Sequence, residues 1–153
     1  MKIFELNDFL DLKKQLDCDK GNKLVMTNGC FDIIHVGHIK LFEESKKLGT
    51  HLVVALNSDK SVKRIKGPSR PINNENDRIK VLSAIEFIDF IILFNEETPQ
   101  KIIQNITPDI LAKGSDYSIE NIVGANHVIS NGGKVVTIDF LEGYSSTKYI
   151  DAL

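Results

Sequence analysis

Five short apolar runs recur along the chain, separated by turns and by segments whose apolar residues have helical spacing. The runs cover residues 23–27, 51–56, 88–94, 108–113 and 134–139. Strands that are separated by helices are joined by right-handed crossovers, which place the strands parallel in one sheet. The pattern therefore predicts an α/β, Rossmann-like fold. We expect a five-stranded parallel sheet in the order 3-2-1-4-5, with the first run central and helices on both faces.

The composition is that of an ordinary globular protein, and its 153 residues fit a single domain over 1–153. A formal net charge of −2 argues against a nucleic-acid-binding surface. No apolar stretch is long enough for a membrane span, and the first residues lack the apolar segment of a signal peptide, so we expect a cytoplasmic protein. Cys18 and Cys30 do not form a disulfide framework, and Cys30 is interpreted as a small turn residue.

Residues 27–42 join the first predicted strand to a helix through a turn that contains two histidines three positions apart. The first N–H groups of a helix are unpaired, so such a turn is a ready anion site. Gly37 lies between His35 and His38 and lets a ligand approach the backbone closely. The alternative is structural: His38 shares a helical stripe with Leu41 and Phe42, where a histidine is often a core residue.

Basic residues follow the second predicted strand at Lys60, Lys63, Arg64 and Lys66. Such a run is usually a solvated helix face. Its position beyond the carboxyl end of a strand favours ligand binding instead, because ligands of open parallel sheets bind there. Arg78 stands near the start of the next predicted helix, where a cation is unfavourable for the helix dipole. We therefore interpret Arg78 as a residue kept for an anion.

The turn His35-Val36-Gly37-His38 resembles the HxGH signature of the cytidylyltransferase-like nucleotidyltransferases. The match extends through further blocks in the same order, and together they resemble the heptose-1-phosphate adenylyltransferases that make ADP-heptose for bacterial lipopolysaccharide. The blocks are Thr27–His35, Asn57–Asp59, Ser61–Pro68, Arg70-Pro71, Thr98-Pro99, Pro108-Asp109, Lys113–Tyr117 and Gly143–Thr147. The resemblance covers nearly the whole chain, from about residue 5 onward.

The resemblance implies transfer of AMP from ATP to a heptose 1-phosphate, with pyrophosphate leaving. The acceptor phosphate is already a nucleophile, so positioning and electrostatics carry such catalysis. By resemblance His35, His38 and Lys66 are catalytic, and a cationic imidazole would add charge at the phosphates. Nucleotide binding is implied for Thr27, Asn28, Gly29, Cys30, Phe31, Asp32, Gly37, His38, Lys113, Gly114, Asp116, Ser145, Ser146 and Thr147. Acceptor binding is implied for Asn57, Lys63, Arg64, Arg70 and Arg78.

Two of these assignments carry a further expectation. Asp32 is expected to orient a histidine or to support magnesium indirectly. Ser146 stands where the superfamily block usually has threonine, which keeps the hydroxyl and leaves its contact open. Mg²⁺ is expected with the triphosphate, held largely by phosphate and water rather than by a direct protein cage.

The expected partners are ATP and a sugar 1-phosphate, with no nucleic acid and no membrane, and by family resemblance a homodimer. Many relatives are fused to a sugar kinase, so a separate kinase is expected here. One alternative is a sister enzyme, such as a glycerol-3-phosphate cytidylyltransferase or an archaeal-type FAD synthetase. Another is a non-catalytic nucleotide-binding regulator that kept the fold.

Overall fold

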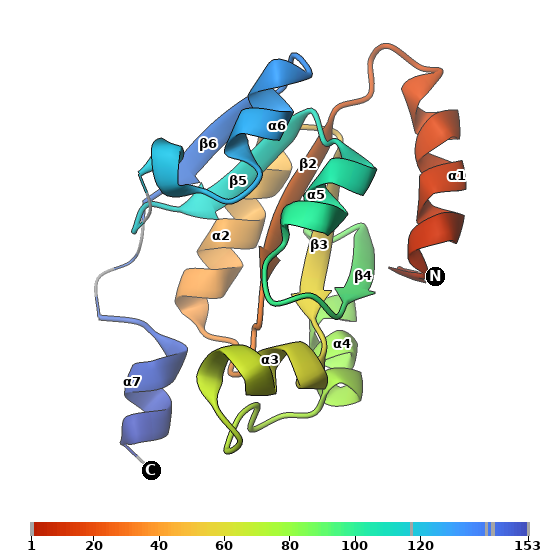
Figure 1. Ribbon diagram of the computed structural model, residues 1–153. Coiled ribbons are helices and arrows are strands. Elements are labelled where there is room, and N and C mark those ends of the chain that lie inside the picture. The colour runs from red at the N-terminus through yellow and green to blue at the C-terminus, as the bar shows by residue number, and fades with distance from the viewer. Residues whose placement is uncertain (1, 117, 140, 142, 153) are drawn as a thin grey trace.

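The computed structural model describes residues 2–116, 118–139, 141 and 143–152. Its centre is a parallel sheet of six strands in the order β1-β4-β3-β2-β5-β6 (Figure 1). Every neighbouring pair is parallel. The strands are β1 (Ile3–Phe4), β2 (Leu24–Gly29), β3 (His51–Asn57), β4 (Phe90–Phe94), β5 (Ile110–Gly114) and β6 (Lys134–Ile138).

The prediction of a five-stranded sheet ordered 3-2-1-4-5 is wrong because the chain adds a strand before the first predicted helix. β1 pairs with β4 through Ile3 opposite Ile91 and Phe4 opposite Ile92. An edge strand offers unpaired backbone groups, and this two-residue segment satisfies some of those on β4. Two residues are too few to show an alternating pattern, so β1 could not be predicted from side-chain periodicity.

Helices cover both faces of the sheet, and each face has its own apolar core. Three helices pack on one face: α1 (Leu6–Asp17), α5 (Gln100–Ile106) and α6 (Ala125–Ser130). The other face is covered by α2 (Val36–Lys47) and α4 (Glu75–Ser83) (Figure 1). Successive residues of a strand point to opposite faces, so Val53 joins the first core while Leu52 and Val54 join the second. The central strand β3 is therefore apolar from Leu52 to Leu56, as a strand of a doubly covered sheet must be.

The remaining helices lie at or lead toward the carboxyl ends of the strands. The basic run after β3 forms α3 (Asp59–Lys66), because the Ser58 side chain accepts a hydrogen bond from the N–H of Ser61 and caps the helix. A 3₁₀ turn at Ile119–Asn121 precedes α6, and Gly124, with a φ of 85°, separates them. The last helix is α7 (Ser146–Asp151). No helix among the described residues has the length and apolar character needed to cross a bilayer.

Candidate active site

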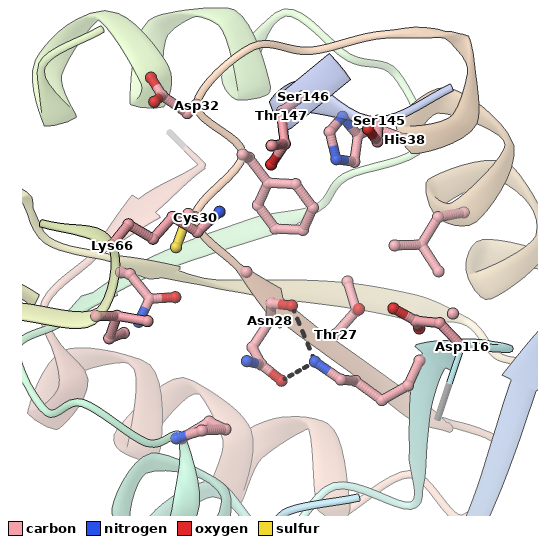
Figure 2. Close-up of a pocket in the computed structure, with 18 of the residues that line it drawn as sticks. Thr27, Asn28, Cys30, Asp32, His38, Lys66, Asp116, Ser145, Ser146 and Thr147 are labelled. Carbon is pink, nitrogen blue, oxygen red and sulfur yellow. Dashed lines mark hydrogen bonds between the residues drawn. The ribbon is translucent and has the colours of Figure 1, made fainter. Parts of the chain in front are cut away.

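A pocket of about 600 Å³ opens beyond the carboxyl ends of β2, β3 and β5 (Figure 2). This is the end of a parallel sheet at which ligands bind. Most of the predicted site residues line the pocket: Thr27, Asn28, Gly29, Cys30, Phe31, Asp32, His35, His38, Asn57, Lys66, Lys113, Gly114, Asp116, Ser145, Ser146 and Thr147. Segments far apart in the sequence therefore meet at one cavity, as the parallel topology requires.

The turn from β2 to α2 is built around Phe31. Its backbone has a φ of 43°, a left-handed conformation that costs a non-glycine residue about 1–3 kcal/mol. The conformation buries the phenyl ring, whose edge meets the His38 imidazole with 5.2 Å between ring centroids. A Cβ on Gly29 would lie 2.9 Å from the same ring, so the strand ends in glycine to make room for it. Phe31 thus forms an apolar support for His38.

His35 and His38 are fixed by the first turn of α2. The N–H of Gly37 donates to Nδ1 of His35 at 3.2 Å, and the N–H of His35 points at Nδ1 of His38 at a longer 3.4 Å. The two rings stack with 3.8 Å between centroids. Because each Nδ1 faces a backbone donor, the proton of each neutral ring is assigned to Nε2. The pair therefore offers two Nε2–H donors.

The histidine pair is neutral near pH 7. Burial lowers the pKa of His35, and burial, with the nearby His35 and Lys66, lowers the pKa of His38 to about 4. Near pH 7 His38 therefore offers a neutral N–H donor rather than the added charge of its cationic form. His38 also combines the two interpretations of the sequence, because it packs against Phe31 and lines the pocket at once.

Gly37 does not line the pocket, although the sequence suggested close approach of a ligand. A Cβ at this position would lie 3.0 Å from Cε1 and Nδ1 of His35. That separation is closer than a methyl group and an imidazole ring tolerate without a shift. Gly37 therefore leaves space for the His35 ring to turn back over the helix start.

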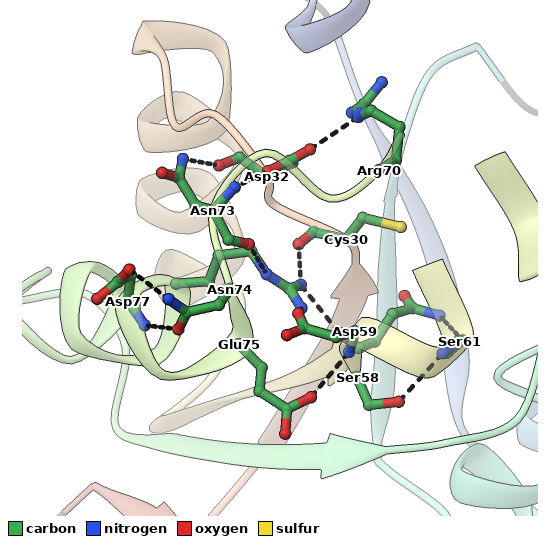
Figure 3. Close-up of polar contacts among 12 residues, drawn as sticks. Cys30, Asp32, Ser58, Asp59, Ser61, Arg70, Asn73, Asn74, Glu75 and Asp77 are labelled. Carbon is green, nitrogen blue, oxygen red and sulfur yellow. Dashed lines mark hydrogen bonds and ion pairs between the residues drawn. The ribbon is translucent and has the colours of Figure 1, made fainter. Parts of the chain in front are cut away.

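Asp32 lies at the edge of the pocket, but its carboxylate is occupied by the loop that follows α3. It accepts hydrogen bonds from Nε of Arg70 at 2.8 Å and from the N–H groups of Ile72 and Asn73 at 2.9 Å (Figure 3). Burial acts to raise the pKa of Asp32, but these donors outweigh it and hold the pKa below its usual value. The Asp32 carboxylate therefore holds the 70–73 loop, and its expected roles of orienting a histidine or supporting magnesium indirectly stay predictions.

Arg78 has a comparable internal role. Its side chain is only 1% exposed, and all three guanidinium nitrogens donate hydrogen bonds. Nη1 donates to the carbonyls of Cys30 and Asn57, Nε to the carbonyl of Asn73, and Nη2 to the Asp59 carboxylate. The prediction that Arg78 binds the acceptor anion is therefore wrong in this geometry. Its guanidinium instead binds the carbonyl just after β2 and the carbonyl at the end of β3.

The other predicted cations differ in whether they line the pocket. Lys66 lines the pocket and extends beside Cys30 (Figure 2). Lys63 and Arg64 do not line it, and Arg64 bonds to the carbonyl of Asn95 in a shallow neighbouring hollow. Arg70 is tied to Asp32 and also lies outside the pocket lining. Of the five residues predicted to bind the acceptor, only Asn57 reaches this cavity.

Burial raises the pKa of the Cys30 thiol, although Lys66, Arg78 and Arg70 act in the opposite direction. Cys30 is therefore a neutral thiol near pH 7 and a poor nucleophile. This agrees with the interpretation of Cys30 as a turn residue. The group of Cys30 that forms a hydrogen bond is the backbone carbonyl, which accepts from Arg78.

Further parts of the pocket lining come from β5 and from the start of α7, and the α7 start lies beside the histidines (Figure 2). Nζ of Lys113 donates to the side-chain oxygen of Asn28 at 3.0 Å (Figure 2), and burial lowers the pKa of Lys113. Ser145 caps α7 through the N–H of Lys148, and the Ser146 hydroxyl donates to the carbonyl of Ile33 at 2.9 Å. The Ser146 hydroxyl thus has a partner within the protein, and its contact with a phosphate stays a prediction. Tyr117, the last residue of its sequence block, lies outside the described residues.

Sequence reasoning missed a second group of pocket residues, most of them apolar: Leu41, Ile65, Glu97, Pro99, Asn121, Ile122, Val123 and Tyr144. Ile65, Pro99 and Tyr144 lie within sequence blocks that resemble the family, so those blocks were the available signal.

Among the described residues, no group of three or more histidine, cysteine, aspartate or glutamate side chains is placed to hold a metal ion. A metal bound at this pocket would therefore need ligands from a bound phosphate or from water.

The parallel α/β sheet, the strand–turn–helix unit and the paired imidazoles at its pocket are the features of a Rossmann-like nucleotidyltransferase type of domain, and the comparisons agree with that class. The chain belongs to the cytidylyltransferase-like family, whose model matches residues 26–152. It is 53% identical to the bifunctional protein HldE of Marinomonas sp. (strain MWYL1) over 131 residues. That match covers 86% of this chain and 28% of the relative. A second HldE, from Nitrosococcus oceani, is 44% identical over 97% of this chain and 31% of that relative.

Two solved structures share the fold. The lipopolysaccharide core biosynthesis protein from Thermoplasma volcanium GSS1 is 34% identical with a TM-score of 0.63, covering 82% of this chain and 100% of that one. The pantoate-beta-alanine ligase from Francisella tularensis has a TM-score of 0.66 over 99% of this chain and 76% of that one, at 15% identity. The second likeness concerns the fold alone. The chain spans less than a third of the length of the two HldE relatives.

Proposed function

We propose that the chain transfers AMP from ATP to a heptose 1-phosphate, giving ADP-heptose and pyrophosphate. The observation that carries the proposal is the stacked pair of neutral imidazoles at the pocket, with Lys66 facing the same cavity. The sequence blocks that resemble heptose-1-phosphate adenylyltransferases support the choice of acceptor. So do the HldE relatives and the lipopolysaccharide core biosynthesis protein among the similar structures.

The proposed reaction is an in-line displacement. An oxygen of the acceptor phosphate forms a bond to the α-phosphorus of ATP, and the bond from that phosphorus to the bridging oxygen of pyrophosphate breaks. No proton has to be removed from the nucleophile. The residues therefore serve to bind, orient and neutralise polyanions.

Each group at the pocket has a proposed part in this step. The Nε2–H groups of His35 and His38 donate to phosphate oxygens of the nucleotide, and Lys66 contributes positive charge there. Lys113 and Asp116 bound the nucleoside, and the α7 start, Ser145–Thr147, contacts the terminal phosphates. Asn57 and Lys66 replace the arginines as the proposed contacts for the acceptor, because both line the pocket.

Mg²⁺ is proposed to arrive with the triphosphate and to neutralise part of its charge. Asp32 is occupied by the 70–73 loop, so the carboxylates that line the pocket and could face the ion or its water are those of Asp116 and Glu97. Coordination would come mainly from phosphate oxygens and water, as is usual for this ion.

A pyrophosphate-release screen tests the proposal. ATP, CTP and GTP are each combined with heptose 1-phosphate, other sugar 1-phosphates, glycerol 3-phosphate and FMN, and initial rates are compared. The highest kcat/KM is expected for ATP with heptose 1-phosphate. Preference for CTP with glycerol 3-phosphate would identify a sister cytidylyltransferase instead, transfer of AMP to FMN would identify an FAD synthetase, and nucleotide binding without turnover would identify a regulator.

We also propose that the protein is a homodimer in the cytoplasm. It follows from the family resemblance and from the frequency of twofold oligomers among soluble proteins. Light scattering at micromolar concentration is expected to give twice the mass of one chain, and the mass of a single chain would contradict it.

A further inference from the structure

The three-residue segment Cys30–Asp32, between β2 and α2, is held from both sides by residues of one later stretch of chain. On one side, Nη1 of Arg78 donates to the Cys30 carbonyl at 2.6 Å. On the other, the Asp32 carboxylate accepts from Arg70 and from the N–H groups of Ile72 and Asn73 (Figure 3). The Asn73 side chain adds a hydrogen bond to the Asp32 carbonyl at 2.6 Å. We refer to these contacts of Asp32 and Arg78 as the 30–32 clamp.

Between the two held residues lies Phe31, the residue with the left-handed backbone. A non-glycine residue keeps this conformation only when its surroundings fix it. The clamp supplies that restraint, because it fixes the carbonyl before Phe31 and the side chain after it. The Phe31 ring then contacts His38 edge-on and also contacts Phe42 of the core, with 5.0 Å between centroids.

We infer that Asp32 and Arg78 are positioning residues for His38, acting through Phe31. Together they determine where Phe31, the apolar support of the imidazole, stands. The catalytic consequence of this inference rests on the proposed function, whereas the structural link from the clamp to His38 does not.

A buried ion pair by itself does not indicate such a role, and the chain offers a comparison. Asp89 accepts from Nζ of Lys46 at 2.5 Å and from the N–H of Leu52 at 2.7 Å. Asp89 thus combines a cation and a backbone donor, as Asp32 does, but Leu52 lies near the amino end of β3, away from the pocket. Replacing Asp89 with asparagine therefore controls for the loss of a structural carboxylate.

The experiment measures the pKa of His38 by NMR of the imidazole in the wild type and in Asp32→Asn, Arg78→Lys and Asp89→Asn variants. The titratable groups that act on His38 are His35 on the same helix and Lys66 on α3, and none of the variants changes them. If the clamp fails, Phe31 shifts, water reaches His38, and its pKa rises toward the ordinary value by about one unit or more. The Asp89→Asn variant is expected to leave the pKa of His38 unchanged.

The direction of the shift distinguishes positioning from simple electrostatics. Removing the negative charge of Asp32 would disfavour the imidazolium and lower the pKa of His38 further. A rise in Asp32→Asn therefore has to come from solvent entry. Arg78→Lys preserves the charge and loses the planar set of donors, so a rise is expected there as well.

Turnover supplies the second readout. Asp32→Asn and Arg78→Lys are expected to lower kcat by up to about a hundredfold, with a smaller change in the KM for ATP, because misplacement of a donor is felt mostly in the transition state. If these variants are too unstable, Asn73→Ala removes only the side-chain hydrogen bond to the Asp32 carbonyl and keeps a folded member in the series.

An unchanged His38 pKa in the folded clamp variants, or an equal change in Asp89→Asn, would overturn the inference. The proposed function fails on a separate observation, the lack of pyrophosphate release by the wild-type protein. A shifted His38 pKa with no turnover on any substrate pair would therefore sustain the clamp and refute the adenylyltransferase.

Discussion

The two walls of the pocket are held in very different ways. On the histidine wall, Asp32 is 3% exposed and Arg78 1% exposed, and both are fully engaged with backbone groups. On the α7 wall no helix residue is buried; its contacts with the histidine wall include the hydrogen bond from the Ser146 hydroxyl to the Ile33 carbonyl and the Tyr149 ring beside His35, with 5.9 Å between centroids. Donors that must not move during a reaction need such internal support. The difference indicates that preorganisation is concentrated around His35 and His38.

The largest expected effect is at the histidines themselves. Replacing His35 or His38 with asparagine is expected to lower kcat by about a hundredfold or more, or about 3 kcal/mol, as for the loss of one preorganised donor. His51→Asn is the control, since His51 starts β3 at the other end of the sheet. Turnover, ATP affinity and thermal stability are measured on the same samples. A folded His38→Asn variant with near wild-type turnover and a lower Tm would make His38 a core residue only.

The next effect is a pH dependence of the free energy of unfolding, which tests how strongly the histidine wall buries His38. Because the pKa of His38 is about 4 in the folded protein and near 6.5 in an unfolded chain, the unfolded chain binds the proton more tightly between these values. The His38 contribution to the free energy of unfolding is therefore complete above about pH 6.5 and is lost as the pH falls toward 4. Urea unfolding is expected to show about 2 kcal/mol of this loss between pH 7 and pH 5.

His35 adds to this dependence in the same direction, since burial lowers its pKa as well. The His38→Asn variant is expected to retain only the weaker dependence. If wild type and variant lose stability in parallel between pH 7 and pH 5, the depressed pKa of His38 is contradicted.

Gly37→Ala is expected to have a smaller effect, with opposite signs on stability and activity. Alanine is favoured over glycine inside a helix by up to about 1 kcal/mol, so Tm is expected to hold or rise. The new Cβ, 3.0 Å from the His35 ring, displaces that imidazole, and we expect roughly a tenfold loss in kcat. Val36→Ala, at an exposed residue one position earlier, is the control. Full activity in Gly37→Ala would show that the His35 position is not critical.

The smallest effect is expected on the α7 wall. Ser146→Ala removes the hydrogen bond to the Ile33 carbonyl, which contributes about 1 kcal/mol or less at this partly exposed position. The KM for ATP is expected to rise about two- to fourfold with little change in Tm. Ser83→Ala, which removes a similar bond to the Lys80 carbonyl on the surface of α4, is the control. A collapse of kcat as large as that of His38→Asn would break the contrast between the two walls.

The sequence by itself determined the features that depend on neighbouring residues. Apolar runs and helical spacing gave five of the six strands and the class of fold, because side-chain periodicity is a local property. Caps such as Asn74, whose side chain accepts from the N–H of Asp77, follow the same logic. The HxGH turn could also be recognised from the sequence, because His35, Gly37 and His38 interact within one helical turn.

Only the tertiary structure decided what the charged residues do. Arg70 meets Asp32 across 38 positions of sequence, and Arg78 meets the Cys30 carbonyl across 48. An arginine intended for a ligand and one that binds a backbone carbonyl have the same local sequence signal. The charge state of His38 is also a tertiary property, because burial against Phe31 and the proximity of Lys66 set it. A side chain's environment comes from the packing of distant segments, and periodicity carries no information about that packing.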